Sequence, residues 1–182
     1  MLNKKIAFLG IISVFGVLVV SFGAQAQGKK KGQLDCAIEE NGATAFGVMV
    51  VRRDGKEIAT SSCGKAILLE KGHYEAAVRL DGALDLPEKA HPVTIRPGGQ
   101  ELVRATFQTG TLEVHAIQGG RKAAALATIF QEGHRVGTLG MGVTGRLSAG
   151  TYMVVVRYRG EEKTFNAVAI ASQERRVLNA EF

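Results

Sequence analysis

Two cysteines are the most reactive side chains of the sequence, and their spacing indicates which kinds of cysteine chemistry are possible. Cys36 and Cys63 are 27 residues apart, which excludes a Cys-x-x-Cys redox motif. A nucleophilic thiol needs a neighbouring histidine that lowers its pKa, and nothing in the sequence indicates one. An even number of cysteines in an exported chain favours a Cys36–Cys63 disulfide, with two buried free thiols as the alternative.

The remaining titratable residues form no recognisable catalytic or metal site. No two of the four histidines have the spacing of metal ligands on one helix face: they are His73, His91, His115 and His134. Three carboxylates gather in one irregular stretch, where a calcium site is the alternative to a solvated loop, but their spacing matches no EF-hand: Asp81, Asp85 and Glu88. Since the Ser-His-Asp pattern and a glycine-rich phosphate loop are also missing, we predict no enzyme, no metal and no cofactor.

The N-terminus has the three parts of a secretory signal peptide. Lys4 and Lys5 precede a long apolar run, and an A-x-A site ends at Ala26. Residues 1–26 are therefore predicted to be a cleaved signal peptide, with an uncleaved membrane anchor as the alternative. We expect an exported protein, either periplasmic or extracellular and associated with the outer membrane.

The positive charge of the chain is concentrated near this N-terminus. Five lysines supply most of the formal net charge of +6: Lys4, Lys5, Lys29, Lys30 and Lys31. The basic tail, residues 27–32, either stays solvated or touches an anionic surface, so membrane contact is expected only through the signal peptide or this tail. Without tryptophan or a basic stripe interleaved with aromatic residues, the chain is not expected to bind nucleic acid.

The chain is an internal duplication. When it is shifted by 78 residues against itself, "KGHYEAAVRLDG" (71–82) matches "AGTYMVVVRYRG" (149–160), and after three extra residues in "ALDLPEK" the match resumes at a shift of 75. The predicted organisation is a first repeat over 33–107, a linker over 108–110 and a second repeat over 111–182. Cys36 and Cys63 align with Val114 and Met141 of the second copy. If the two cysteines meet inside the first copy, apolar residues are expected at both positions of the copy that lacks the bond.

Each repeat has the period-two pattern of half-buried strands. Tyr74, Ala76, Val78 and Leu80 share one face of a strand, and glycine-containing turns recur about every ten residues. In the first repeat we predict strands near 33–38, 45–52, 56–60, 65–69, 73–80, 91–96 and 100–107. In the second we predict them near 111–117, 123–130, 134–138, 143–147, 151–158, 164–171 and 175–182. The segment "RKAAALATIFQEGHR" has helical propensity, but its alignment with "ATAFGVMVVRRDGKE" favours a strand.

Seven short strands in each 75-residue repeat predict two tandem, seven-stranded antiparallel β-sandwiches. The pattern G-(K/R)-x-(I/V)-x-T followed by L-x-x-G-x-Y-x-x-x-V resembles the prealbumin-like, Ig-like sandwiches of bacterial envelope proteins, such as PEGA-type and carboxypeptidase-regulatory-like domains. The Pro-Glu-Gly-Ala turn of the PEGA pattern is missing. The resemblance implies an accessory module for display, spacing or weak ligand contact rather than a catalyst.

These observations predict a non-enzymatic structural or protein-interaction module of the bacterial cell envelope, whose partner is another envelope protein. A carbohydrate or peptidoglycan binding module, with a glycan as partner, and a hydrolase accessory domain or inhibitor are the alternatives. Tyr74 and Tyr152 are expected to pack inward with their hydroxyls bound to the backbone at a strand corner. Arg79 and Arg157, which should face solvent at equivalent positions, are the candidate interaction residues.

Overall fold

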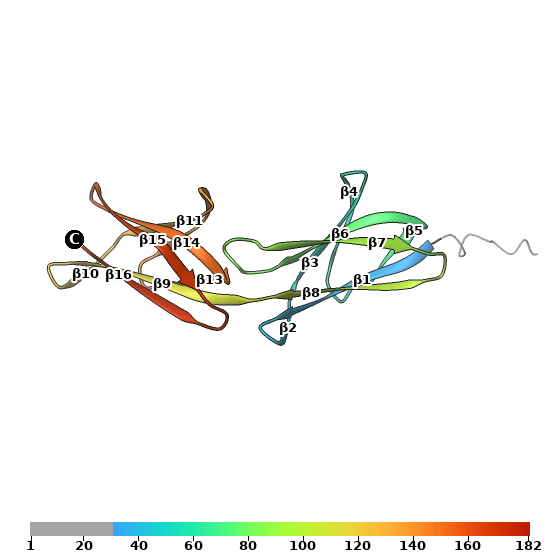
Figure 1. Cartoon of the computed structure of the whole chain (residues 1–182), viewed down its shortest axis with the longest axis horizontal. Helices are drawn as coiled ribbons and strands as arrows, with labels where there is room; N and C mark the ends of the chain where they lie inside the picture. Colours follow the sequence, from blue (N-terminus) through green and yellow to red (C-terminus); the bar gives the residue numbers. More distant parts are fainter. Residues whose placement is uncertain (1–30) are drawn as a thin grey trace, which may run out of the picture.

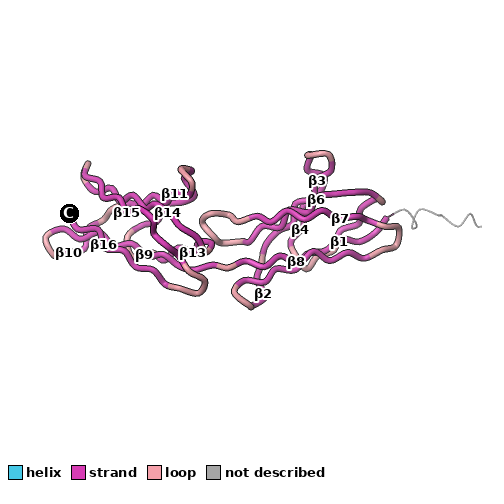
Figure 2. Tube along the Cα trace, in the orientation of Figure 1, coloured by secondary structure: helices cyan, strands magenta, loops and turns pink. Residues whose placement is uncertain are grey.

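The computed structural model describes residues 31–182. The predicted signal peptide and residues 27–30 of the basic tail lie outside the described residues. Within the described part the chain consists of strands, turns and loops, as Figure 2 shows, which confirms the all-β prediction. No helix in residues 31–182 is long and apolar enough to cross a membrane.

The first half of the chain forms eight strands in two sheets. The strands are β1 (Lys31–Glu40), β2 (Ala43–Ala45), β3 (Gly47–Arg53), β4 (Lys56–Ser62), β5 (Ile67–Glu70), β6 (Gly72–Leu80), β7 (Glu88–Ile95) and β8 (Gln100–Phe107). In one sheet β1 is central, with β2 and β5 on one side and β8 on the other. The other sheet has the order β4-β3-β6-β7.

The second half repeats this arrangement strand for strand. The strands are β9 (Thr109–Gln118), β10 (Arg121–Ala123), β11 (Leu126–Gln131), β12 (His134–Gly140), β13 (Thr144–Ser148), β14 (Gly150–Tyr158), β15 (Glu161–Ile170) and β16 (Arg175–Glu181). Here β9 takes the central place of β1, and the facing sheet has the order β12-β11-β14-β15. The segment with helical propensity forms β10 and β11, so the strand prediction for it is confirmed.

Each half encloses its own hydrophobic cluster, to which both of its sheets contribute. The first cluster includes Leu34, Ile38, Met49, Val51, Tyr74, Val78, Leu80, Val103 and Phe107. The second includes Leu112, Val114, Ile129, Leu139, Leu147, Tyr152, Val154, Val156 and Leu178. All four inward positions predicted for β6 are buried, which confirms the strand register.

Two features of the predicted strand arrangement are wrong: each half has eight strands instead of seven, and not all of them are antiparallel. β8 runs parallel to β1, and β16 runs parallel to β9. The alternating pattern of a strand records which face is buried, but it carries no information about the direction of the neighbouring strand. The direction depends on the path of the chain between the two sheets.

The extra strand arises because the predicted strand 45–52 is divided between the two sheets. Residues 43–45 pair with β1, whereas the chain from Gly47 onward pairs with β6 in the other sheet. Phe46 lies between them with 87% of its surface exposed. A Cβ atom on Gly47 would lie 2.1 Å from the backbone oxygen of Arg79, so the close crossing at this switch requires glycine.

The two halves lie end to end, and β8 runs almost directly into β9 (Figure 1). Only Gln108 separates the two strands, since Thr109 and Gly110, expected in the linker, belong to β9. On the opposite side of the junction the β6–β7 loop, drawn in green, extends toward the second half. This loop, residues 81–87, contains the three-residue insertion, whereas the equivalent β14–β15 turn is only residues 159–160.

Candidate functional site

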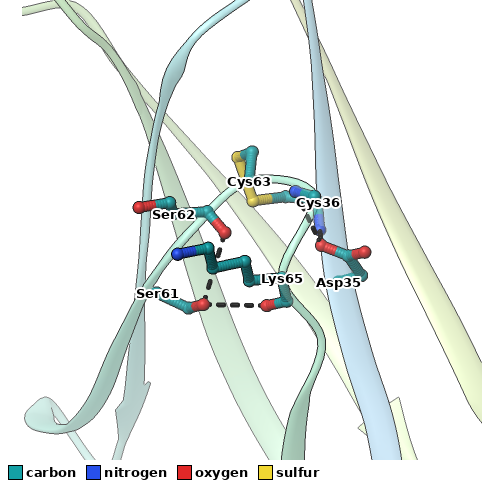
Figure 3. Close-up of a disulfide and its surroundings, with 7 residues drawn as sticks. Asp35, Cys36, Ser61, Ser62, Cys63 and Lys65 are labelled. Carbon is teal, nitrogen blue, oxygen red and sulfur yellow. Dashed lines mark hydrogen bonds between the residues drawn. A yellow bond between two sulfur atoms is a disulfide. The ribbon is translucent and has the colours of Figure 1, made fainter.

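The structure joins Cys36 and Cys63 in a disulfide with a Cα–Cα distance of 4.6 Å. Cys36 lies in central strand β1 and Cys63 follows edge strand β4, so the bond ties the two sheets of the first half together (Figure 3). Around it Gly64 N donates to the Cys36 carbonyl at 3.0 Å and to Asp35 Oδ1 at 3.0 Å. The bond therefore closes a corner in which Cys36 is buried and Cys63 is partly buried, and it leaves neither cysteine as a free thiol.

The second half builds the same corner without a disulfide. The equivalent of Cys36, Val114, is completely buried, and the equivalent of Cys63, Met141, packs against the same second cluster. Gly142 N donates to the Val114 carbonyl at 2.8 Å, which repeats the bond between Gly64 and Cys36. The backbone of this corner thus does not depend on the covalent bond.

The two candidate interaction residues both have partners within their own sheets. Arg79 Nη2 lies 2.9 Å from Glu88 Oε2, and Arg157 Nε lies 2.8 Å from Glu162 Oε2. Arg52 joins the first pair, because its Nη1 lies 3.1 Å from Glu88 Oε1. Arg157 leaves 71% of its side chain exposed against 37% for Arg79. Their repeated occurrence therefore has a structural account as cross-strand ion pairs, and their role in binding a partner stays a prediction.

Two carboxylates make the stability of the fold sensitive to acid. Hydrogen bonds from Arg79 and Arg52 lower the pKa of Glu88, and Arg175, followed by His115 and Thr144, lowers the pKa of Glu113. A lowered folded-state pKa stabilises the fold above the unfolded-state pKa, and this contribution is lost as pH falls through the folded value. We therefore expect the urea midpoint to fall as pH decreases below about 4.5.

The variant Glu113→Gln tests this expectation. It should lower the urea midpoint at about pH 6, where the carboxylate is charged, and reduce the loss measured between about pH 6 and pH 3. Urea unfolding followed by circular dichroism at both pH values provides the comparison. A variant that loses as much stability as the wild type over this range would contradict the assignment.

The equivalent tyrosines both form the predicted corner, which confirms that expectation. The hydroxyl of Tyr74 donates to the carbonyl of Glu70 at 2.9 Å, and the hydroxyl of Tyr152 donates to that of Ser148 at 2.8 Å. Both rings are buried in the cluster of their own half. These aromatic side chains are consequently structural and do not form a sugar-stacking platform.

Polar and apolar contacts join the two halves at their junction. Leu84, at the tip of the β6–β7 loop, packs against the second cluster, and its N–H donates to the Arg146 carbonyl at 2.9 Å. Two glycines make room for it, because Cβ atoms on Gly137 and Gly145 would lie 3.1 and 2.6 Å from atoms of Leu84. The first repeat has Ala59 and Ile67 at the equivalent positions.

Asp85 adds a polar contact beside Leu84. Both of its carboxylate oxygens lie 3.2 Å from Ser148 N, and Oδ2 accepts a hydrogen bond from the Tyr152 hydroxyl at 3.1 Å. Burial and the neighbouring Asp85 carboxylate raise the pKa of Tyr152 well above its usual value. The three inserted residues therefore place a leucine and an aspartate of the first half on the second half.

Substitutions at the equivalent tyrosines, Tyr74 and Tyr152, test how much the Asp85 contact contributes to stability. Tyr152→Phe removes the one hydroxyl proton that the Ser148 carbonyl and the Asp85 carboxylate share, whereas Tyr74→Phe removes only the bond to the Glu70 carbonyl. We expect Tyr152→Phe to lower the free energy of unfolding of the whole chain by about 1 kcal/mol more than Tyr74→Phe, because a carboxylate is left with one donor fewer. If chemical denaturation shows that both variants lose the same free energy of unfolding, the hydrogen bond between the Tyr152 hydroxyl and Asp85 does not contribute to stability.

A second set of contacts lies where β8 passes into β9. The side chain of Asn41 donates from Nδ2 to the Thr109 carbonyl at 2.9 Å and accepts from Thr109 N at 2.9 Å. Ser172 Oγ donates to Asn41 Oδ1 at 2.9 Å, and Arg146 Nη1 lies 2.8 Å from Glu40 Oε2. Hydrogen bonds and one ion pair thus join the halves next to their covalent connection.

Neither the histidines nor the loop carboxylates form a metal site. Glu88 pairs with arginines and Asp85 accepts from Ser148 N, so two of the three carboxylates suggested as calcium ligands are used in other contacts. His73 Nδ1 lies 3.0 Å from Thr94 Oγ1, and His115 Nε2 lies 2.9 Å from Glu113. Across residues 31–182 no group of three or more His, Cys, Asp or Glu side chains is close enough to hold a metal ion.

The junction contacts of Leu84 and Asp85 were not predicted from the sequence. Leu84 and Asp85 are in a stretch that reads as a turn, and their partners Gly145 and Ser148 lie more than sixty residues further along the chain. The difference between the repeats is the sequence feature that could have indicated this contact. The first repeat carries three additional residues, and the second has Gly145 where the first has Ile67.

Comparison with known proteins gives similarity to solved structures only. No model of a protein family and no curated protein matches the chain. It is similar to the minor pilin GBS52 of Streptococcus agalactiae (TM-score 0.40, 11% identity, covering 84% of this chain and 94% of the pilin). It is also similar to the TIE protein of Bacillus anthracis (TM-score 0.38, 16% identity, covering 84% of this chain and 34% of that protein). A third similar structure is the pilus adhesin SpaC of Lactobacillus rhamnosus GG (TM-score 0.34, 12% identity, covering 82% of this chain and 31% of the adhesin). The chain thus spans about a third of the length of the last two proteins, and similarities of this size assign it to no family.

Proposed function

We propose that this chain is an exported, non-enzymatic module of the bacterial cell envelope, in which two β-sandwiches produced by duplication form a stiff spacer that presents interaction surfaces. The proposed repeats are residues 33–107 and 111–182. The observation that carries the proposal is the junction, where Leu84, Asp85 and Asn41 of the first repeat all bind the second. A single-residue connection with contacts on both sides restricts bending, which is what a spacer requires.

Several features support export and a structural role. A disulfide persists in oxidising compartments outside the cytoplasm, and the N-terminal sequence reads as a signal peptide. The groups with shifted pKa values have structural partners: Glu88 and Glu113 pair with arginines, and Tyr152 is part of the junction. A hydrolase would instead place such groups together in a cleft.

The carbohydrate-binding alternative has less support. A platform for sugar stacking needs several exposed aromatic rings, whereas Phe46 is the one phenylalanine among the strongly exposed hydrophobic residues of the described part. The two buried corner tyrosines are unavailable for stacking. We therefore prefer an interaction with a protein partner.

Residual dipolar couplings of the mature chain, partially aligned in solution, test the stiff junction. If the two repeats move as one body, couplings from residues 33–107 and from 111–182 fit a single alignment tensor in the relative orientation that the structure shows. Two tensors of different magnitude would mean that the repeats move independently, and the spacer function would be excluded.

A further inference from the structure

A groove of about 380 Å³ lies between β7 and β8 in the first repeat. Its walls are residues 91–94 of β7, Arg96, and residues 101–104 of β8. Among residues 31–182 each flanking strand is the last strand of its sheet, since β7 pairs with β6 alone and β8 pairs with β1 alone. The groove therefore runs along two strand edges that have backbone hydrogen-bonding groups without a neighbouring strand.

The two edges differ in their capacity to accept another strand. β7 contains Pro92, which has no N–H to donate, and proline is a common means of blocking an edge strand. β8 contains no proline, and its pairing with β1 runs over eight residues without a bulge. An added strand would consequently pair with β8 and leave β7 as the opposite wall.

The charges of the groove favour an acidic partner. Arg96 and Arg104 are both exposed on its walls, and neither forms an ion pair with any group in residues 31–182. The groove contains one carboxylate, from Glu101. Leu102, half-exposed between the charged residues, adds an apolar contact.

His91 is a second, independent indication of a binding site. It lies opposite Ala76 in the register, and Ala76 is fully buried, so the imidazole faces inward between the sheets. Its Nε2 is buried and has no hydrogen-bond partner in the described protein. A buried polar atom without a partner destabilises the free protein, and such groups are expected where a ligand or water completes the contact.

The second repeat also ends in two open strand edges, β15 and β16, but it lacks the two arginines and the buried histidine. Opposite Val154, the equivalent of Ala76, the register places Phe165, which packs against the second cluster where the first repeat has His91. The positions equivalent to Arg96 and Arg104 are Ala171 and Asn179. The two repeats share their backbone arrangement and differ here in their side chains. The arginines and the inward-facing histidine are therefore particular to the first repeat.

We propose that the β7–β8 groove of the first repeat binds an extended acidic peptide segment of a partner protein, which adds as a strand to β8 and places carboxylates against Arg96 and Arg104. This rests on the proposed function as an interaction module and specifies the surface and the partner. Main-chain hydrogen bonds to β8 supply affinity, and the two guanidiniums select acidic side chains.

The test uses the mature chain and a blocked heptapeptide of alternating glutamate and valine as the probe. Titration followed by amide NMR spectra should shift the resonances of residues 91–94 and 101–104. A peptide with lysine in place of glutamate, and one N-methylated at alternate residues, should both fail to bind. Perturbations elsewhere, or none at millimolar peptide, would overturn the proposal, as would equal binding of the N-methylated peptide.

Charge reversal provides the matched comparison. Arg96→Glu combined with Arg104→Glu should weaken binding by about tenfold or more. Asn179→Glu, at the position of the second repeat equivalent to Arg104, should leave it unchanged. Thermal melts show that each variant is folded. An acidic oligosaccharide is titrated in parallel, and binding of that glycan alone to the same residues would exclude a peptide partner. Failure of the peptide to bind leaves the dipolar-coupling result unaffected, so the two proposals are tested separately.

Discussion

Replacing the disulfide with the residues of the second repeat, Cys36→Val with Cys63→Met, is expected to lower the free energy of unfolding by about 3 kcal/mol. The bond closes a loop with a sequence separation of 27 residues, and its loss increases the entropy of the unfolded chain. Because Val114 and Met141 occupy the same corner in the second repeat, the backbone should be retained. Chemical denaturation of the variant and the oxidised wild type measures the difference.

Two controls separate loop closure from packing. Alanine at both positions should cost more than the valine–methionine pair, since it also leaves a cavity between the sheets. Reduction of the wild type should lower stability by an amount similar to the valine–methionine variant. If thiol labelling of denatured, unreduced protein detects two free thiols, the disulfide is not formed in solution.

Leu84→Asp is expected to uncouple the two repeats. The substitution places a carboxylate against the apolar surface of Leu139 and the glycine backbone at Gly145, which is unfavourable unless the loop withdraws into solvent. Withdrawal also exposes the surface that Leu84 covers, so we expect docking of the repeats to weaken by about 2 kcal/mol. Residual dipolar couplings should then require two alignment tensors.

Leu86→Asp, in the same loop, is the matched control. Leu86 is 60% exposed and is not among the residues packed against either hydrophobic cluster, so the change adds the same charge to the same loop without removing a contact to either cluster. Its couplings should fit the single tensor of the wild type. A single tensor for Leu84→Asp as well would show that the hydrogen bonds around Asn41 and Thr109 are sufficient to hold the repeats together.

The features that the sequence predicted correctly are local or repeated. The alternation of Tyr74, Ala76, Val78 and Leu80 records a buried face, and the strand positions follow from it. The duplication adds independent information, because two versions of one structure differ only where their environments differ. This comparison indicated that Cys36 and Cys63 lie at one corner, because apolar residues replace both of them in the other copy.

The features that it did not predict depend on contacts between distant segments. The parallel pairing of β8 with β1, the division of one predicted strand at Phe46 and the docking of Leu84 against Gly145 all follow from the three-dimensional path of the chain. The groove beside β8 likewise exists only because two sheets end next to each other.

The sequence by itself thus determined the all-β class, the duplication and the buried face of strands such as β6, because a strand that buries one face has hydrophobic residues at every second position. The tertiary structure alone decided which strand edges stay open and how the repeats are joined. The physical reason is that the inserted loop and the arginines beside β8 have a role only relative to surfaces formed by other parts of the chain.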